Sequence, residues 1–240
     1  MKKLKRTALY GGTFDPVHNG HIRIAQTFLE LFALDDFCFV PAHVAPHKRE
    51  TNVTPPIHRY AMLALATQAD ERMRISTVEL DAPEKPYTID TLLKFCAEEK
   101  EGAQFFFVMG ADSWAEIRTW RDWERLLQLT NHIVVTRPGY ELNAEHVTAQ
   151  IRERIVDLRG LNEEQIRHRS TEGNGAKIYV TDAVAMDVSA TSIRRSVRSE
   201  SSGEWRQNVP PPVADYIQKY KLYKDQHETE LDSKRTGSAH

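Results

Sequence analysis

Short apolar segments alternate along this chain with longer segments in which apolar residues recur every three or four positions. The first kind predicts strands and the second predicts amphipathic helices. Strands are expected at Thr7–Tyr10, Phe37–Val40, Met73–Val78, Phe105–Met109, His132–Thr136 and Ile178–Val180. Helices are expected over Asn19–Leu34, Pro56–Ala69, Ile89–Glu99, Asp122–Leu129, Ala144–Leu158, from a cap at Ser189 to Val197, and over Pro211–Tyr220. The polar stretch Leu161–Ala176 indicates a loop or a short helix.

Strands that alternate with helices are typical of an α/β fold, so we predict a doubly wound parallel sheet. In such a sheet, ligands bind beyond the carboxyl ends of the strands. Polar motifs follow the expected strands at residues 11–21, 41–48, 110–113, 136–139 and 187–194, so they should converge on one edge. In the second helix, an apolar stripe is expected to face the core, formed by Ile57, Tyr60, Ala61, Leu63 and Ala64.

The composition excludes several classes of protein. Of the 240 residues, 40% are hydrophobic and 28% are charged, which is ordinary for a globular domain. The net charge of −2 gives no attraction to nucleic acid or to an anionic membrane, so neither is expected as a partner. No apolar run approaches the ~20 residues that span a bilayer. We expect a cytoplasmic protein with one domain over residues 1–223 and a disordered tail over residues 224–240.

The two cysteines, Cys38 and Cys96, lie far apart in apolar surroundings and have no metal-ligand spacing. Buried thiols in a reducing compartment are therefore expected. The basic start of the chain, residues 1–6, leads toward paired glycines and not into the apolar segment of a signal peptide.

The candidate chemistry concentrates in residues 11–21, which read Gly-Gly-Thr-Phe-Asp-Pro-Val-His-Asn-Gly-His. This stretch joins an expected strand to an expected helix. Paired glycines let the backbone approach a ligand, and the start of a helix offers free N–H groups to a phosphate. His18 and His21 lie three residues apart and can face the same way. Two solvated histidines on a plain turn are the simpler alternative, but the strand, turn and helix order favours phosphate binding.

Neither the G-x-x-x-x-G-K-[ST] loop nor the G-x-G-x-x-G pattern occurs in this stretch, so histidine and backbone groups must bind the phosphate. The His-x-Gly-His motif resembles the nucleotidylyltransferase superfamily, and within it the bacterial nicotinate-nucleotide adenylyltransferases. Further matches occur in the family's order and cover most of residues 6–223. They are Pro46-His47-Lys48, Tyr87-Thr88-Ile89-Asp90-Thr91-Leu92, Gly110-Ala111-Asp112-Ser113, Thr119-Trp120 and Ser189-Ala190-Thr191-Ser192-Ile193-Arg194.

The resemblance implies a transfer of the adenylyl group of ATP to nicotinate mononucleotide, giving nicotinate adenine dinucleotide and pyrophosphate in NAD biosynthesis. The attack is in line and forms no covalent enzyme intermediate. His18 and His21 are the implied catalytic residues, with His21 at the α-phosphate. The residues implied to bind ATP are Gly11, Gly12, Thr13, Phe14, His18, His21, Lys48, Gly110, Asp112, Ser113, Arg137, Ser189, Thr191, Ser192 and Arg194.

Nicotinate mononucleotide is implied to bind Thr13, Lys48, Thr88, Trp120 and Arg121. Trp120 would stack on the pyridine ring, and N–H groups at the start of the helix would bind its carboxylate. An amide would leave donors unpaired at ~1–3 kcal/mol per group, so the acid should be preferred. Magnesium is implied as the ATP complex, which uses substrate phosphates and water, and no protein metal site is expected.

The residues also leave simpler roles open. Lys48 can be a solvated loop lysine, Thr88 and Asp112 can be helix N-caps, and Trp120 can belong to the core. Superfamily members acting on phosphopantetheine, glycerol phosphate or riboflavin phosphate would share the first motif but lack Thr88 with Trp120. A nucleotide sensor without catalysis would lack one of the histidines or the arginine at 194. The residue types do not decide the oligomeric state, and a homo-oligomer is open.

Overall fold

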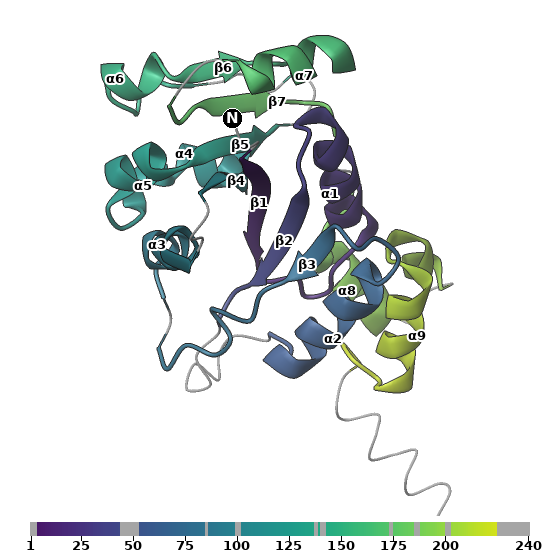
Figure 1. Ribbon diagram of the computed structural model, residues 1–240. Helices are drawn as coiled ribbons and strands as arrows, with labels where there is room; N and C mark the ends of the chain where they lie inside the picture. The colour runs from purple at the N-terminus through teal and green to yellow at the C-terminus, as the bar shows by residue number, and fades with distance from the viewer. Residues whose placement is uncertain are drawn as a thin grey trace, which may run out of the picture.

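The computed structural model describes residues 4–43, 53–84, 86–98, 102–136, 139, 143–172, 175–184, 188–199 and 203–224. Its strands form a seven-stranded sheet in the order β3-β2-β1-β4-β5-β7-β6, and every neighbouring pair is parallel (Figure 1). The strands are β1 Lys5–Gly12, β2 Asp36–Pro41, β3 Met73–Ile75, β4 Ala103–Gly110, β5 Asn131–Val135, β6 Ile155–Asp157 and β7 Ile178–Thr181. The predicted doubly wound parallel sheet is confirmed.

Helices cover both faces of this sheet (Figure 1). One core lies beneath α1 Asn19–Leu31, α2 Pro56–Thr67, α8 Ala190–Arg198 and α9 Pro211–Lys219. The other lies beneath α3 Thr88–Glu98, α4 Ala111–Ala115, α5 Trp123–Leu129 and α6 Ala149–Arg152. The helix α7 Glu163–Thr171 packs against α1. In the described ranges, no helix is both long enough and apolar enough to cross a membrane.

The central strands are buried on both faces because alternate residues point into the two cores. In β4, Phe106 and Val108 join the core of α1, whereas Phe105, Phe107 and Met109 join the core of α3. The register pairs Leu9 with Phe107 and Phe107 with His132. Continuous apolar runs are typical of such doubly covered strands.

The segment Ala144–Leu158 does not form the single helix that its pattern predicts. It contains the four-residue α6 and then the edge strand β6, which pairs with β7 through Ile155 and Ile178. The Arg154 side chain fixes this edge, because its Nε donates to the carbonyl of Ala176 at 2.7 Å and its Nη2 to that of Leu127 at 2.8 Å. The pairing of β6 with the distant strand β7 therefore prevails over the helical spacing of apolar residues in the local sequence.

The polar stretch that follows contains a regular helix, α7, within the predicted loop or short helix. Asn162 caps it: Asn162 Oδ1 accepts from the Gln165 N–H at 2.9 Å, and Gln165 Oε1 accepts from the Asn162 N–H at 3.0 Å. Reciprocal capping of this kind satisfies donors that a short helix otherwise leaves free.

The predicted apolar stripe of α2 is partly wrong. Ile57 and Tyr60 are 69% and 36% exposed, while Arg59 is fully buried with Met62 and Leu63. Compared with the predicted orientation, α2 is rotated about its axis so that Arg59 faces the loops at the carboxyl edge of the sheet. There its guanidinium donates to backbone carbonyls.

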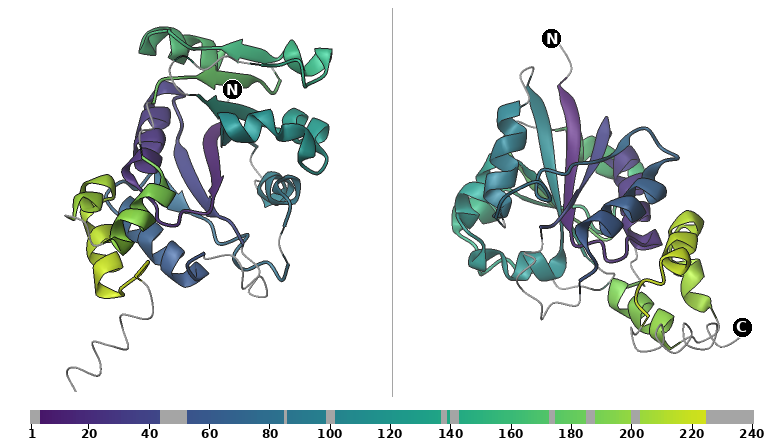
Figure 2. Two further views of the ribbon diagram at one scale, coloured as in Figure 1. Left: turned by 180° about the vertical axis from the view of Figure 1, so that it is seen from behind. Right: turned by 90° about the horizontal axis from the view of Figure 1, so that it is seen from below.

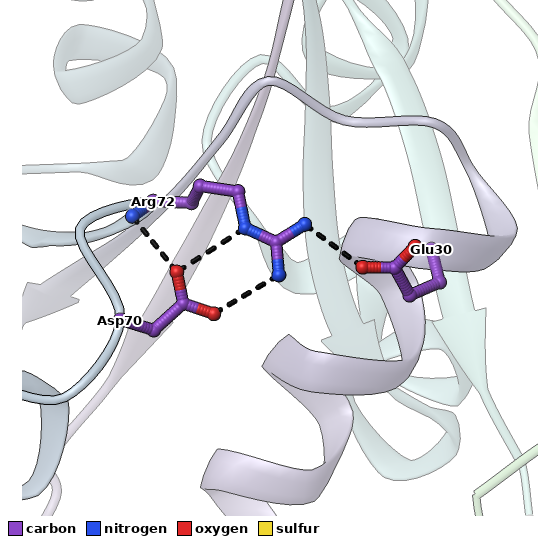
Figure 3. Close-up of polar contacts among 3 residues, drawn as sticks. All are labelled: Glu30, Asp70 and Arg72. Atoms are coloured by element: carbon purple, nitrogen blue, oxygen red, sulfur yellow. Dashed lines mark hydrogen bonds and ion pairs between the residues drawn. The ribbon is translucent and has the colours of Figure 1, made fainter.

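The turn that precedes β3 is joined to α1 by a charged cluster (Figure 3). Arg72 donates to Asp70 through Nε at 3.2 Å and Nη2 at 3.1 Å, and through Nη1 to Glu30 at 2.8 Å. Because these side chains are solvated, the cluster contributes little to stability. Both cysteines are free, with Cys38 buried and Cys96 half-buried.

Candidate active site

The glycine-rich turn connects β1 to α1 at the carboxyl edge of the sheet. Phe14 within it is buried and has a φ of 50°, and the Asp15–Pro16 peptide is cis. A Cβ on Gly12 would lie 3.0 to 3.3 Å from three atoms of the Phe14 ring. A side chain at this position would therefore require the Phe14 ring to shift by a few tenths of an ångström. The strand, turn and helix order that the motif requires is present.

His18 and His21 stack at the start of α1, with ring centroids 3.6 Å apart and an angle of 22° between the planes. Nδ1 of His21 accepts the backbone N–H of His18 at 3.2 Å. In the neutral ring this assigns the proton to Nε2, which makes His21 a hydrogen-bond donor. Nδ1 of His18 is buried without a hydrogen-bond partner among the described residues.

Burial keeps both rings uncharged at neutral pH. Desolvation lowers the pKa of His18 to about 4. The pKa of His21 is also well below its ordinary value, first because of burial and then because of repulsion from His18. A neutral donor beside the free N–H groups of a helix start suits an anionic phosphate oxygen.

Arg194 reaches the same turn from α8. Its Nη1 donates to the carbonyl of Asp15 at 2.6 Å, and its Nη2 lies 3.4 Å from Oγ1 of Thr191. Ser189 caps this helix as predicted, because its Oγ accepts from the Ser192 N–H at 3.2 Å. The structure thus brings together two motifs that lie about 170 residues apart in the chain.

A cavity of about 120 Å³ adjoins the glycine-rich turn. Both Thr88 and Trp120 line it, next to Gly11 and Gly12. The full lining is Leu9, Gly11, Gly12, Val40, Ala42, Glu79, Thr88, Thr91, Leu92, Phe107 and Trp120. Trp120 is half-buried and packs its edge against Phe107, with ring centroids 6.2 Å apart, so part of the indole remains accessible.

The wall of this cavity carries the negative charge of Glu79. The Glu79 carboxylate accepts from the Thr91 hydroxyl at 2.9 Å. Outside this lining, the Arg121 guanidinium lies 4.7 Å from the centre of the exposed Tyr87 ring. Thr88 is the first residue of α3 and not its N-cap, because the Tyr87 carbonyl accepts from the Asp90 N–H at 2.9 Å.

Gly110, Asp112 and Ser113 lie where β4 passes into α4, also at the carboxyl edge. Gly110 is the N-cap of α4, so the exposed Asp112 in its first turn is not the capping residue. Lys48 and Arg137, which the resemblance implies at the phosphates, lie outside the described residues.

Arg59 is the residue of this region that the sequence pattern missed. It is fully buried and donates to three backbone carbonyls: from Nε to Thr54 at 3.0 Å, from Nη1 to Thr13 at 2.8 Å, and from Nη2 to Ala42 at 3.0 Å. It therefore joins the glycine-rich turn to the segments that follow β2 and precede α2. Its place in an amphipathic helix gave no signal of burial.

A larger hollow, of about 530 Å³, lies at the opposite edge of the sheet. Its principal cation, Arg6, donates within the protein to the Phe32 and Ser170 carbonyls and to Gln104 Oε1. The Arg6 guanidinium of that hollow is thus already paired within the protein, and the histidines of the glycine-rich turn lie elsewhere.

Comparison with known proteins gives consistent matches over nearly the whole chain. The model of the cytidylyltransferase-like family matches residues 9–196. A probable nicotinate-nucleotide adenylyltransferase of Thermoanaerobacter sp. (strain X514) is 36% identical over 228 residues, which are 95% of this chain and 99% of the relative. One of Corynebacterium glutamicum is 33% identical over 240 residues, covering 100% of this chain and 98% of the relative.

Among solved structures, Plasmodium falciparum nicotinic acid mononucleotide adenylyltransferase complexed with NaAD matches with a TM-score of 0.66 and 19% identity. The match covers 91% of this chain and 97% of that chain. At this identity the likeness is one of fold.

Proposed function

The chain belongs to the cytidylyltransferase-like family and, within it, to the nicotinate-nucleotide adenylyltransferases, and we propose that it joins nicotinate mononucleotide to ATP. The products are nicotinate adenine dinucleotide and pyrophosphate, a step of NAD biosynthesis. One observation carries this assignment. The cavity lined by Thr88 and Trp120 opens against Gly11 and Gly12, so a pyridine site adjoins a phosphate site.

The reaction needs no nucleophile from the protein, because the phosphate of the mononucleotide is ionised near neutral pH. A phosphate oxygen forms a bond to the α-phosphorus of ATP as the bond from that phosphorus to the bridging oxygen breaks. The electron pair of the broken bond leaves with pyrophosphate. The site contributes by positioning the reactants and by stabilising charge on the transferred group.

On the phosphate side, His21 donates from Nε2 to an α-phosphate oxygen, and the start of α1 adds backbone donors. Arg194 binds the β- and γ-phosphates with charge-assisted hydrogen bonds. Magnesium arrives as the ATP complex and keeps most of its ligands from phosphate and water. In the described residues, no group of three His, Cys, Asp or Glu side chains is placed to hold a metal ion.

On the pyridine side, Trp120 stacks on the nicotinate ring, which is a cation in the mononucleotide. The Glu79 carboxylate in the cavity wall is complementary to that positive charge. The first N–H groups of α3, at Thr88, bind the carboxylate of the substrate. An amide in the same place would turn an NH2 group toward a donor, so the acid is the preferred substrate.

The role of His21 is tested by the variant His21→Ala. Pyrophosphate release from ATP, Mg²⁺ and nicotinate mononucleotide should fall in kcat by about 100-fold or more, since a preorganised donor to the reacting phosphate is removed. The KM values for both substrates should change far less. His168→Ala is the matched control, because the His168 side chain on α7 is 74% exposed and remote from the turn. Full turnover in His21→Ala would contradict the assignment.

A further inference from the structure

The chain bends back toward the glycine-rich turn after its last helix. Beyond α9, both Lys221 and Tyr223 have left-handed backbone conformations, with φ of 51° and 70°. Side chains as large as these rarely adopt such angles, and glycine would do so without cost. Figure 2 shows α8 and α9 lying beside α2 at one end of the molecule, and α2 and α9 are in contact. The two left-handed residues thus occur where the C-terminal segment approaches the glycine-rich turn.

The bend carries the Tyr223 side chain inward. Its hydroxyl donates to Oδ1 of Asp15 at 2.7 Å and lies 4.0 Å from Sδ of Met62 on α2. By contrast, Tyr220, three residues earlier, is 48% exposed and packs its ring at a tilt of 41° against that of Tyr216. Tyr223 therefore keeps a backbone conformation of raised energy, and this conformation places its hydroxyl group against Asp15.

Asp15 is a junction within the glycine-rich turn. It is 2% exposed, and its second carboxylate oxygen, Oδ2, accepts the Thr54 N–H at 3.0 Å. Its backbone carbonyl accepts from Nη1 of Arg194 at 2.6 Å. One residue thus links the C-terminal segment, the segment before α2, and the arginine of α8. His18 follows only three positions later.

The hydroxyl of Tyr223 remains protonated over the working pH range. Burial, followed by the neighbouring Asp15 carboxylate, raises the pKa of Tyr223 above its ordinary value. The contact is thus a hydrogen bond from a neutral phenol to a buried carboxylate, a charge-assisted bond stronger than one between neutral groups.

We propose that Tyr223 is a positioning residue for the phosphate side of the active site, acting through Asp15. By holding the Asp15 carboxylate, it fixes the glycine-rich turn and the carbonyl that orients Arg194. The inference rests on the proposed function for the identity of the nucleotide. It assigns a role in ATP binding to a residue 205 positions after His18, outside the matched family region of residues 9–196.

The variant Tyr223→Phe removes the hydroxyl and keeps the ring. Oδ1 of Asp15 then loses its donor in a buried place, and the turn and Arg194 lose their common anchor. We expect the KM for ATP to rise about tenfold, so that kcat/KM for ATP falls by about the same factor, while the KM for nicotinate mononucleotide stays within about twofold. Tyr220→Phe, the matched control, should leave both values unchanged. Loss of folded protein alone would instead lower kcat, and with it kcat/KM for both substrates equally, and would leave both KM values unchanged.

The path through Asp15 is tested by coupling with Arg194→Lys. If Tyr223 acts by orienting Arg194, the double variant with Tyr223→Phe should be no worse than Arg194→Lys alone. If the two substitutions instead lower kcat/KM for ATP by factors that multiply in the double variant, the path through Arg194 is contradicted. Should Tyr223→Phe prove unstable in urea, Asp15→Ala removes the acceptor of the same hydrogen bond and should give the same selective loss for ATP.

Calorimetric titration with ATP and Mg²⁺ separates this proposal from the proposed function, because it needs no acceptor. A weaker ATP affinity in Tyr223→Phe than in Tyr220→Phe supports the positioning role, even if the wild type does not use nicotinate mononucleotide. Equal ATP affinity and equal kcat/KM for ATP in the two variants would overturn it.

Discussion

Arg59 is predicted to be the single side chain on which the loops around the site depend most. It is fully buried and donates to the carbonyls of Thr13, Ala42 and Thr54 at 2.8 to 3.0 Å. The variant Arg59→Met keeps most of the volume and removes all three donors.

The magnitude follows from the three acceptors. A buried carbonyl left without its donor costs ~1–3 kcal/mol, so three of them cost at least about 3 kcal/mol. Part of this is offset, because burial already lowers the pKa of Arg59, which means that its charged form is desolvated in the native protein. We expect the free energy of unfolding to fall by about 3–5 kcal/mol, as when one partner of a buried charged network is removed.

The assay is urea unfolding with an unchanged m value, so that the shift in midpoint reports stability. Arg72→Met is the matched control. Arg72 also makes several hydrogen bonds, to Asp70 and Glu30, but its side chain is 45% exposed (Figure 3). That variant should cost less than about 1 kcal/mol. Similar losses in the two variants would refute the reasoning from burial.

Two further predictions concern pH and the glycine-rich turn. Burial lowers the pKa of His132 to about 3, against ~6.5 in the unfolded chain, so its stabilising contribution is complete above pH ~6.5 and is lost as the pH falls toward 3. Between pH 7.5 and 5, wild-type stability in urea should drop by ~2 kcal/mol more than that of His132→Leu; parallel pH profiles would disprove this. Gly12→Ala should destabilise by ~1–3 kcal/mol, because the new Cβ would lie 3.0 Å from the Phe14 ring, whereas on Gly11 the nearest atoms are 3.7 Å away. Thermal unfolding of the two alanine variants compares them directly, and an equal loss in both would rule out the contact with Phe14 as the cause.

The sheet was predictable from local patterns because its central strands are buried on both faces. Phe105–Met109 is apolar without interruption, and the sequence places it correctly within β4. The predicted helix over residues 144–158 is wrong because the structure of this segment depends on a distant part of the chain. Its last residues pair with β7, and the energy of that pairing comes from a segment more than 20 residues away.

The site was predictable where its residues are close in sequence and not where they are distant. The turn of residues 11–21 contains its glycines and both histidines, so one stretch shows its chemistry. Arg59 and Tyr223 act on that turn from 46 and 208 residues away, measured to Thr13 and Asp15. A buried arginine in an amphipathic helix has the same local pattern as a solvated one, so only the fold shows its role.

The most direct test of the proposed function is pyrophosphate release by the wild-type protein from ATP and Mg²⁺, with nicotinate mononucleotide and nicotinamide mononucleotide offered in parallel. The cavity beside the glycine-rich turn, with Thr88 at its helix start and Trp120 in its wall, predicts strong turnover with the acid and weak turnover with the amide. Equal rates would contradict the account of specificity, and no turnover with either nucleotide would contradict the proposed function itself.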